Sequence, residues 1–548
     1  MKKMFFALAV VLLAFQVSYG QNYNHVTVID TNFDNNSLGG WTARSDSSRG
    51  LGNKVELDRN IKASGAASMR VFDRTFTWMG AIHKLTDNAV PGDIYSMTAK
   101  IYFQGGPATG AFTFSMERAY NNRGNTYDNI QTFQARRGQW TEISAEFAIP
   151  TDPSQTGIWI YFELPWKQEG QTNDNDRIDF WLDDVKVIKL DPASRPTAEI
   201  NIPNLRDSWS RYFDVGAAAG INHIDPNSQY AQLLIKHFSV LVAENEHKWN
   251  AIQPQEGQFN WTQADRIIEF AENTGMRVRW HALVWHEQMP DWLFQDRRNA
   301  SRPAARNLLN DRMKTHIQTV VRRYRNRVDC YDVVNEALAD NGGDRNGLRT
   351  AAQGSKWYEI LGPEYIDNAF RWAREVDPNA RLVINDYNLE SSAYKRNNMA
   401  GLIRGMKERG VPVDAVGLQM HISVSQPPVE EIRQTIELFG SLGVKVIITE
   451  MDMSIYGGDR EPLKEVTPQI LLAQAQRYRD IWAVFVEQAE KGNLGDMVLL
   501  WGTTDNMSWK NNFPVRGRTD APLLFDSRYK AKPAFWALTD PRRVQGLR

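Results

Sequence analysis

From about Leu205 to the end of the sequence, short apolar runs alternate with amphipathic stretches, and this alternation constrains the fold most. In stretches such as 267–271 and 313–324, apolar residues recur at helical spacing. Because a strand that is apolar throughout is buried on both faces, such runs between helices indicate parallel strands. We count eight runs: Phe213–Ala217, Phe238–Val242, Arg277–Trp285, Asp329–Val334, Arg381–Ile384, Ala415–Met420, Lys445–Ile448 and Met497–Trp501.

Eight strand-and-helix units predict an α/β fold in which residues 206–548 form a (β/α)8 TIM barrel. A doubly wound open sheet is the alternative. The sequence has no glycine-rich first turn of the nucleotide-binding type, which disfavours that alternative.

The first half of the sequence has a different pattern. Runs such as Ser96–Phe103, Gly110–Met116 and Ile158–Glu163 alternate with period two and are separated by turn residues. This pattern predicts an all-β sandwich (jelly-roll) domain over residues 21–190, with 179–188 as a closing strand. We expect a linker at 191–205, because its first residues, 191–197, are rich in proline and small residues.

The N-terminus resembles a secretory leader. Lys2 and Lys3 precede the short apolar stretch 5–15, and Ser18 and Gly20 are small residues at the expected cleavage site. We therefore expect residues 1–20 to be a signal peptide and the protein to be secreted, whether extracellular or periplasmic. The single cysteine, Cys330, excludes an intramolecular disulfide.

Charge and composition exclude several partners. The formal net charge is -1, so neither nucleic acid nor an anionic membrane surface is an expected partner. The 18 Trp residues fit either large cores or surfaces that stack on sugar rings.

Seven of the predicted strands end in polar or aromatic residues, and in a barrel those ends converge on one mouth. Any one of them is explained by a cap or a turn, but the set of seven indicates a functional site. The strand ends are Glu244 with Asn245; His281, Trp285 and His286; Asn335 with Glu336; Asn385 to Asn388; Gln419 with His421; Glu450 with Asp452; and Trp501 with Thr504 and Asp505.

Within this set, Glu336 and Glu450 each follow a strand, which suits glycoside hydrolysis. One carboxyl group protonates the leaving oxygen, and the other attacks the sugar or activates water. The histidine spacing matches no catalytic zinc site, so we expect neither a metal in the catalytic site nor a cofactor for catalysis.

The second half resembles glycoside hydrolase family 10 along nearly its whole length. The similarity rests on a series of motifs in the family's order: 243–249, 281–286, 332–337, 419–421, 447–452, 501–505 and 522–526. It implies an endo-1,4-β-xylanase that acts by a retaining mechanism on xylan or xylo-oligosaccharides. The departures are small, such as His247 where Met is usual and Tyr331 where Trp is usual.

The resemblance also implies roles for single residues. Glu336 would be the acid/base and Glu450 the nucleophile. Asn335 would hydrogen-bond the sugar 2-hydroxyl, His421 would orient Glu450 with Asp452 behind it, and Gln419 would lie near the catalytic pair. The expected substrate-binding residues are Glu244, Asn245, Lys248, His281, Trp285, Trp501 and Trp509.

The first half resembles a carbohydrate-binding module of family 22, through motifs at 64–71, 78–80 and 180–185. The resemblance implies a xylan-binding groove. Its expected sugar contacts are Arg44, Trp78, Tyr127, Trp159 and Glu163. Oxygen-rich turns suit calcium, so we also expect a structural calcium ion at Asp183 or Asp184, near Asp30.

Two alternative functions stay open. The chain could be a non-catalytic polysaccharide-binding protein, which the presence of both Glu336 and Glu450 disfavours. It could also be a glycosidase for another β-glycan, because the sequence does not reveal the space around C5 of the sugar. We expect a monomer.

Overall fold

The computed structural model describes residues 26–85, 89, 92–121, 124–150, 154–168, 170–190, 197–458, 461–515 and 518–547. The chain divides into two compact units, residues 1–195 and 196–548. The expected signal peptide, residues 1–20, lies outside the described residues. Of the expected linker, residues 197–204 are part of the second unit, where Lys530 Nζ donates to the Thr197 carbonyl at 2.9 Å and Ala531 N donates to Glu199 Oε2 at 2.9 Å.

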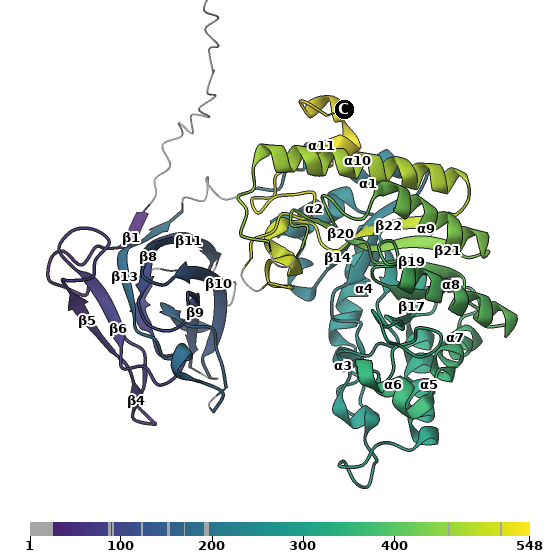
Figure 1. Cartoon of the computed structure of the whole chain (residues 1–548), viewed down its shortest axis with the longest axis horizontal. Helices are drawn as coiled ribbons and strands as arrows, with labels where there is room; N and C mark the ends of the chain where they lie inside the picture. The colour runs from purple at the N-terminus through teal and green to yellow at the C-terminus, as the bar shows by residue number, and fades with distance from the viewer. Residues whose placement is uncertain are drawn as a thin grey trace, which may run out of the picture. The chain divides into compact units, whose positions relative to one another are not determined.

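The first unit is the predicted all-β sandwich, built of two antiparallel sheets (Figure 1). One sheet has the order β11-β8-β13-β6-β5, with β1 paired to β13: β1 (Val26–Thr31), β5 (Lys54–Asp58), β6 (Ser68–Phe72), β8 (Ile94–Phe103), β11 (Thr141–Ala148) and β13 (Phe180–Lys189). The other has the order β10-β9-β12-β7-β2: β2 (Thr42–Ala43), β7 (Ala81–Lys84), β9 (Thr109–Tyr120), β10 (Thr126–Arg136) and β12 (Gln155–Glu163). The strands β3 (Ser45–Asp46) and β4 (Leu51–Gly52) form a separate two-stranded antiparallel ribbon.

The period-two alternation read in the sequence explains how this sandwich packs. Along β8, every second residue is buried, and these residues face the other sheet. Phe114 on β9, Phe147 on β11 and Phe162 on β12 are buried and in ring contact across the core. The opposite side of β12 carries Trp159, Tyr161 and Glu163.

The second unit is the predicted barrel. Its strands pair in parallel in the order β19-β18-β17-β16-β15-β14-β22-β21, and β19 pairs with β21 to close the ring, which excludes an open doubly wound sheet. The short β20 (His421–Ser423) pairs with the C-terminal residues of β21, 452–454. The eight barrel strands are β14 (Asp214–Ala219), β15 (Val240–Ala243), β16 (Arg277–Trp280), β17 (Cys330–Asn335), β18 (Arg381–Asp386), β19 (Ala415–Leu418), β21 (Lys445–Ser454) and β22 (Leu494–Leu500).

Helices surround the barrel strands (Figure 1). Their apolar faces contribute to one large core with the strands, in which residues such as Ile317, Phe370 and Phe485 are fully buried. The helices are α1 (Leu205–Trp209), α2 (Gln229–His237), α3 (Trp249–Ile252), α4 (Thr262–Thr274), α5 (Arg306–Tyr324), α6 (Lys356–Leu361), α7 (Glu364–Val376), α8 (Ala393–Glu408), α9 (Val429–Ser441), α10 (Pro468–Glu490) and α11 (Pro533–Thr539).

Two strands differ most in length from the sequence prediction. The predicted run Arg277–Trp285 ends as a strand at Trp280, and only Val284 forms a further bridge, to Val334. The predicted run Lys445–Ile448 instead continues to Ser454 and carries Glu450 inside the strand. Apolar runs alone could not mark these ends. The loop residues 282–284 are buried and as apolar as a strand, whereas β21 continues through the buried polar residues Thr449, Glu450 and Asp452.

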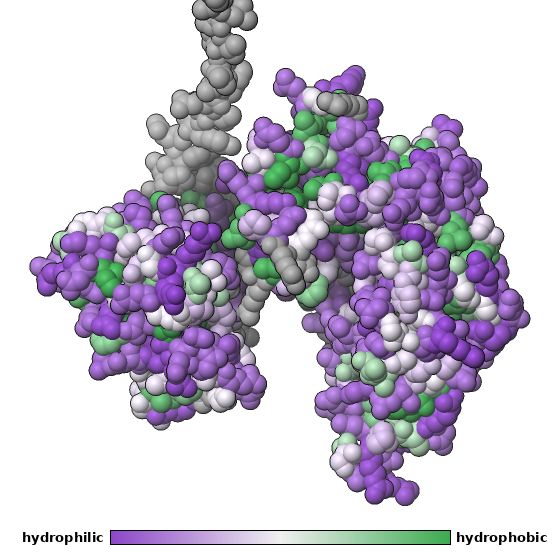
Figure 2. Space-filling model, in the orientation of Figure 1, coloured by the Kyte–Doolittle hydropathy of each residue, from purple (hydrophilic) through white to green (hydrophobic). Residues whose placement is uncertain are grey.

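The visible face of both units is mainly hydrophilic, with small scattered apolar areas (Figure 2). Within the described part of the chain, the helices are too short or too polar to cross a lipid bilayer.

Candidate active site

The two glutamates singled out by the sequence lie just after β17 and in the second half of β21, beyond the residues of β21 that pair with β19. Glu450 is within β21 and is 4% exposed. Glu336 follows the last residue of β17 and has a left-handed backbone, with φ of 55°. This conformation costs a residue other than glycine about 1–2 kcal/mol, so the surrounding contacts have to hold it.

Glu450 is held by four polar groups. Asn385 Nδ2 donates to its Oε1 at 2.8 Å, and His421 Nε2 lies 3.4 Å from its Oε2. His281 Nδ1 and Arg279 Nη2 lie 3.8 and 3.9 Å from Oε1. Burial would raise the pKa of this carboxyl, but the charges of His281, His421 and Arg279 outweigh it and lower the pKa to about 2. Glu450 is therefore ionised at every ordinary pH.

His421 sits between two carboxylates. Its Nδ1 lies 3.0 Å from Asp452 Oδ2, on the side away from Glu450. Burial opposes a charge on the ring, but Asp452 and Glu450 overcome this and raise the pKa of His421 to about 9. The imidazolium thus stays charged near neutral pH and keeps its contact with Glu450.

Glu336 has a contrasting environment. Its Oε2 accepts a hydrogen bond from Trp285 Nε1 at 2.9 Å, and its Oε1 accepts from Gln419 Nε2 at 3.1 Å and from Asn335 Nδ2 at 3.2 Å. Burial and the nearby charge of Asp386 raise its pKa, and the donors from Gln419 and Trp285 only partly offset this. Glu336 therefore keeps its proton to higher pH than an exposed glutamate.

Asn385 joins the two glutamates. Its Nδ2 donates both to Glu450 Oε1 and to Asn335 Oδ1, each at 2.8 Å, and Asn335 in turn contacts Glu336. Thr449 Oγ1 donates to Asn385 Oδ1 at 2.7 Å and fixes the amide. Sequence reasoning noted Asn385 only as a polar strand end. The sequence signal for this role was that Asn385 lies at the end of the strand that follows the one ending in Asn335.

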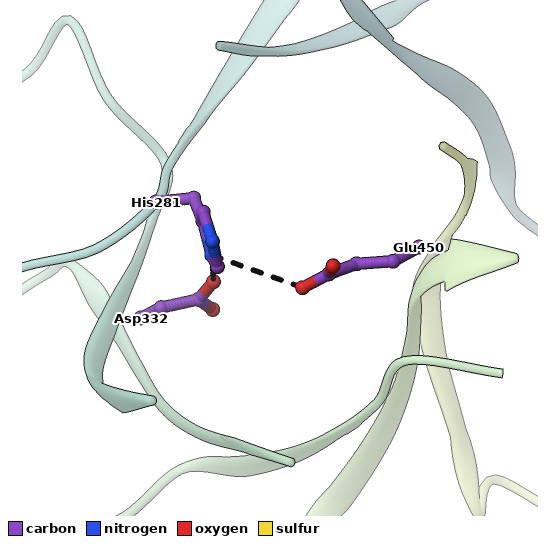
Figure 3. A group of neighbouring side chains, drawn as sticks. All are labelled: His281, Asp332 and Glu450. Atoms are coloured by element: carbon purple, nitrogen blue, oxygen red, sulfur yellow. Dashed lines mark hydrogen bonds and ion pairs between the residues drawn. The ribbon is translucent and has the colours of Figure 1, made fainter. Parts of the chain in front are cut away.

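Beneath Glu450 lies a second network that the sequence did not reveal. His281 Nδ1 is 2.7 Å from Asp332 Oδ2, and Figure 3 shows His281 reaching toward both Asp332 and Glu450. Arg279 is fully buried, forms an ion pair with both oxygens of Asp332, and donates from Nη1 to the Thr449 carbonyl at 3.2 Å. His281, which we expected to bind sugar, therefore also belongs to this scaffold.

His281, Asp332 and Glu450 are the one group of His, Cys, Asp and Glu side chains, within the ranges that the structure describes, whose ligand atoms lie close enough together to hold a metal ion. Arg279 is in contact with Asp332 and lies near Glu450. A cation bound there would face this guanidinium, so the group does not fit a metal and is better explained as a charge network.

The expected sugar-binding residues cluster beside the two glutamates. Lys248 Nζ donates to Asn245 Oδ1 at 3.2 Å and lies 4.9 Å from the centre of the Trp285 ring. Burial and the neighbouring Glu246 raise the pKa of Glu244 to about 7, against the effect of Lys248. Trp285 was expected as a ring wall, and the structure adds its hydrogen bond to Glu336.

Trp501 and Trp509 flank the nucleophile. Trp501 packs edge-on against His281 and His421, at centroid distances of 5.4 and 6.5 Å. The Trp509 indole donates to Asp452 Oδ2 at 2.7 Å. Phe513 stacks on Trp509 at 5.0 Å and is 57% exposed, which extends the aromatic surface beyond what the sequence indicated.

In the first unit, all five expected sugar contacts line a single groove of about 1200 Å³. Tyr161 and Trp166, which sequence reasoning did not select, line it as well. The alternation along β12 places Tyr161 on the same side as two of the predicted residues. The lining residues singled out in the sequence are Arg44, Trp78, Tyr127, Trp159 and Glu163.

Arg44 organises the groove. Its Nη1 lies 2.9 Å from Glu163 Oε2 and donates to the Trp78 carbonyl at 3.0 Å. Its guanidinium covers the Tyr161 ring at 3.9 Å and lies 5.2 Å from the centre of the Tyr127 ring. Burial raises the pKa of Glu163 to about 7, although Arg44 opposes the shift. Charged groups and aromatic faces therefore meet where a sugar chain could lie.

The carboxylates expected to hold calcium already have protein partners. Asp183 Oδ2 accepts from the backbone N–H groups of Ala63 and Ser64, at 2.8 and 3.1 Å. Asp184 is paired with Lys100 at 2.9 Å, and Asp30 with Lys186 at 3.3 Å. Calcium takes six to eight oxygen ligands, and the ammonium groups of Lys100 and Lys186 compete with such an ion for the carboxylates of Asp184 and Asp30.

The model of glycosyl hydrolase family 10 matches residues 204–541, and the model of a carbohydrate binding domain matches residues 27–172. The chain belongs to glycosyl hydrolase family 10 and carries an N-terminal carbohydrate-binding domain.

Several curated relatives span both domains. "Endo-1,4-beta-xylanase C" of Paenibacillus barcinonensis is 39% identical over 520 residues, or 93% of this chain and 47% of that protein. "Exoglucanase XynX" of Acetivibrio thermocellus is 33% identical over 543 residues, or 96% of this chain and 46% of that protein. The chain thus spans about half the length of these relatives.

Among solved structures, a family 10 enzyme from Paenibacillus barcinonensis is 46% identical, with a TM-score of 0.62. It covers 64% of this chain, and this chain covers 100% of it.

The contacts of Glu336 predict how its pKa responds to a change at Gln419. The Gln419 amide donates to the Glu336 carboxyl and stabilises its ionised form. In Gln419→Ala, Glu336 would hold its proton to higher pH. We expect the alkaline limb of the pH profile of kcat/KM to move up, while the acid limb, set by Glu450, stays at low pH. Gln434→Ala, which removes an exposed amide bound to Glu430, is the control. An alkaline limb that stays in place or moves down would contradict this account.

Proposed function

We propose that this chain is an endo-1,4-β-xylanase that hydrolyses internal β-1,4-xylosidic bonds of xylan by a retaining double displacement. The observation that carries the proposal is the opposite tuning of two carboxyl groups in one site: the pKa of Glu450 is about 2, while that of Glu336 is raised. An ionised nucleophile facing a protonated acid is the starting state that this reaction needs.

In the first step, a Glu450 oxygen attacks the anomeric carbon, and Glu336 gives its proton to the departing glycosidic oxygen. The C–O bond to the leaving sugar breaks as the bond to Glu450 forms. Asn335 donates directly to Glu336 and is linked to Glu450 through Asn385. This position suits Asn335 to hydrogen-bond the 2-hydroxyl of the reacting sugar.

The second step reverses the roles. Once Glu450 is an ester it carries no charge, and its contribution to the raised pKa of Glu336 disappears. Glu336, now ionised, takes a proton from water, and the hydroxide displaces Glu450 from the sugar. His421, held by Asp452, then stabilises the returning carboxylate.

The choice of xylan rests on the family and on the name of the Paenibacillus barcinonensis relative. The relative named as an exoglucanase keeps a β-glucan as the second candidate substrate. The paired glutamates with their partners disfavour a purely binding role. We further propose that the protein is secreted, because residues 1–20 resemble a secretory leader. We also propose that it acts as a monomer and that its first unit binds xylan through the groove around Arg44.

The substrate is tested by reducing-sugar release from arabinoxylan and from carboxymethylcellulose. We expect release from arabinoxylan, and a fall of about 10⁴-fold in Glu450→Ala, because the nucleophile is lost. Release mainly from carboxymethylcellulose would keep the mechanism and overturn the substrate. No release from either polymer would overturn the enzymatic proposal.

The binding groove is tested by affinity electrophoresis of the full chain in xylan gels. Trp78→Ala should weaken retardation by about tenfold or more, since a ring of the groove is lost, and should leave hydrolysis of short soluble oligosaccharides unchanged. Trp140→Ala is the matched control, because Trp140 is a partly buried ring of the same unit that packs on Tyr102 away from the groove. Equal retardation of the two variants would contradict the assignment.

A further inference from the structure

The segment from Glu336 to Leu338 leaves the barrel by a turn that its own residues do not stabilise. Glu336 has the left-handed backbone described above, and its N–H donates to the Asn385 carbonyl at 2.8 Å. The three successive carbonyls of residues 336, 337 and 338 then need donors from elsewhere, because a buried carbonyl without a partner is unfavourable.

One residue supplies all three donors. The Arg349 backbone N–H donates to the Ala337 carbonyl at 2.8 Å. Its side-chain Nε donates to the Glu336 carbonyl at 3.3 Å, and its Nη2 to the Leu338 carbonyl at 3.1 Å. The planar guanidinium fits this task, since it presents several donors in fixed directions, which a lysine does not.

Arg349 is itself fixed from two sides. Its Nη2 also donates to the Tyr387 hydroxyl at 3.1 Å, and its Nη1 to the Gln353 carbonyl at 3.4 Å. Leu338 is held through both of its backbone polar groups: its N–H donates to Asp386 Oδ2 at 3.0 Å, and its carbonyl accepts from Arg349. The turn that carries Glu336 is thus clamped between Arg349 and the end of β18.

We propose that Arg349 is a positioning residue for the acid/base: by binding the carbonyls of residues 336 to 338 it aims the Glu336 carboxyl at the glycosidic oxygen. This inference rests on the proposed role of Glu336. Arg349 acts through the backbone of the turn, so its loss should impair proton transfer more than nucleophilic attack.

Leaving-group chemistry separates these two effects. A 2,4-dinitrophenolate departs without a proton, whereas phenolate and a sugar hydroxyl depend on the acid. Because kcat/KM reports the first irreversible step, the formation of the glycosyl-enzyme, the ratio of kcat/KM for phenyl and 2,4-dinitrophenyl β-xylobioside measures how well the acid works.

The chain offers a matched control. Arg374, at the end of α7, donates from Nη1 to the carbonyls of Pro378 and Ala380, both at 2.7 Å, and of Asp377 at 3.4 Å. It clasps a turn as Arg349 does, but at the start of β18, the opposite end of that strand from Asn385. Arg374→Met therefore removes a comparable clasp away from the acid.

For Arg349→Met we expect kcat/KM for the phenyl xylobioside to fall by about 10–100-fold, the size of effect that a small misplacement of a catalytic group produces. The value for the dinitrophenyl xylobioside should stay near that of the unaltered protein. Arg349→Lys retains the positive charge and replaces Arg349→Met in the test if that variant does not fold. It should show the same selective loss to a smaller degree. Arg374→Met should leave the ratio unchanged.

Glu336→Gln sets the reference for complete loss of the acid and separates the two proposals. Suppose that Glu336→Gln shows the selective loss, but that in the Arg349 variants kcat/KM falls equally for both substrates or for neither. The inference on Arg349 is then overturned, and the role of Glu336 stands. If Glu336→Gln spares the phenyl substrate, Glu336 is not the acid, and both proposals fail together.

Discussion

The charge of Glu450 is the feature on which the rest of the site depends. A carboxylate buried to this extent would normally take up a proton, because burial favours the neutral form. Here the surrounding groups reverse that preference, and His421 in turn keeps its own charge because Asp452 lies behind it. A chain of alternating charges, carboxylate, imidazolium and carboxylate, therefore keeps the nucleophile ready to react.

The barrel makes this possible by bringing the ends of its strands together. Segments far apart in the sequence supply Glu336 after β17, Asn385 on β18, Gln419 after β19 and Glu450 on β21. Hydrogen bonds, in part through Asn335, join these residues. The same ring places Arg279 and Asp332 beneath them as a buried ion pair. The two carboxyl groups thus receive different environments from one scaffold: positive charges surround Glu450, whereas Glu336 lies near the negative charge of Asp386.

The fold could be predicted from the sequence because apolar periodicity differs so clearly between the two halves, and the sheet topology confirms both fold classes. The polar strand ends indicated the mouth of the barrel. Arg279 and the clasp of Arg349 escaped prediction for physical reasons: Arg279 lies within a strand whose neighbours are apolar, and Arg349 acts on carbonyls that carry no sequence signal. The partners of Asp183 and Asp184, which are backbone N–H groups and Lys100, also escaped prediction, because composition does not show them.

The central claim, that Glu450 attacks the sugar directly, is tested most directly by trapping the glycosyl-enzyme. A 2-deoxy-2-fluoro-xylobioside with a 2,4-dinitrophenyl leaving group slows both steps but still allows the first, so the ester accumulates. The account predicts that mass spectrometry of proteolytic fragments finds one fluoroxylobiosyl group, attached to Glu450. Attachment to another residue, or turnover of xylan with inversion and no trapped ester, would contradict it.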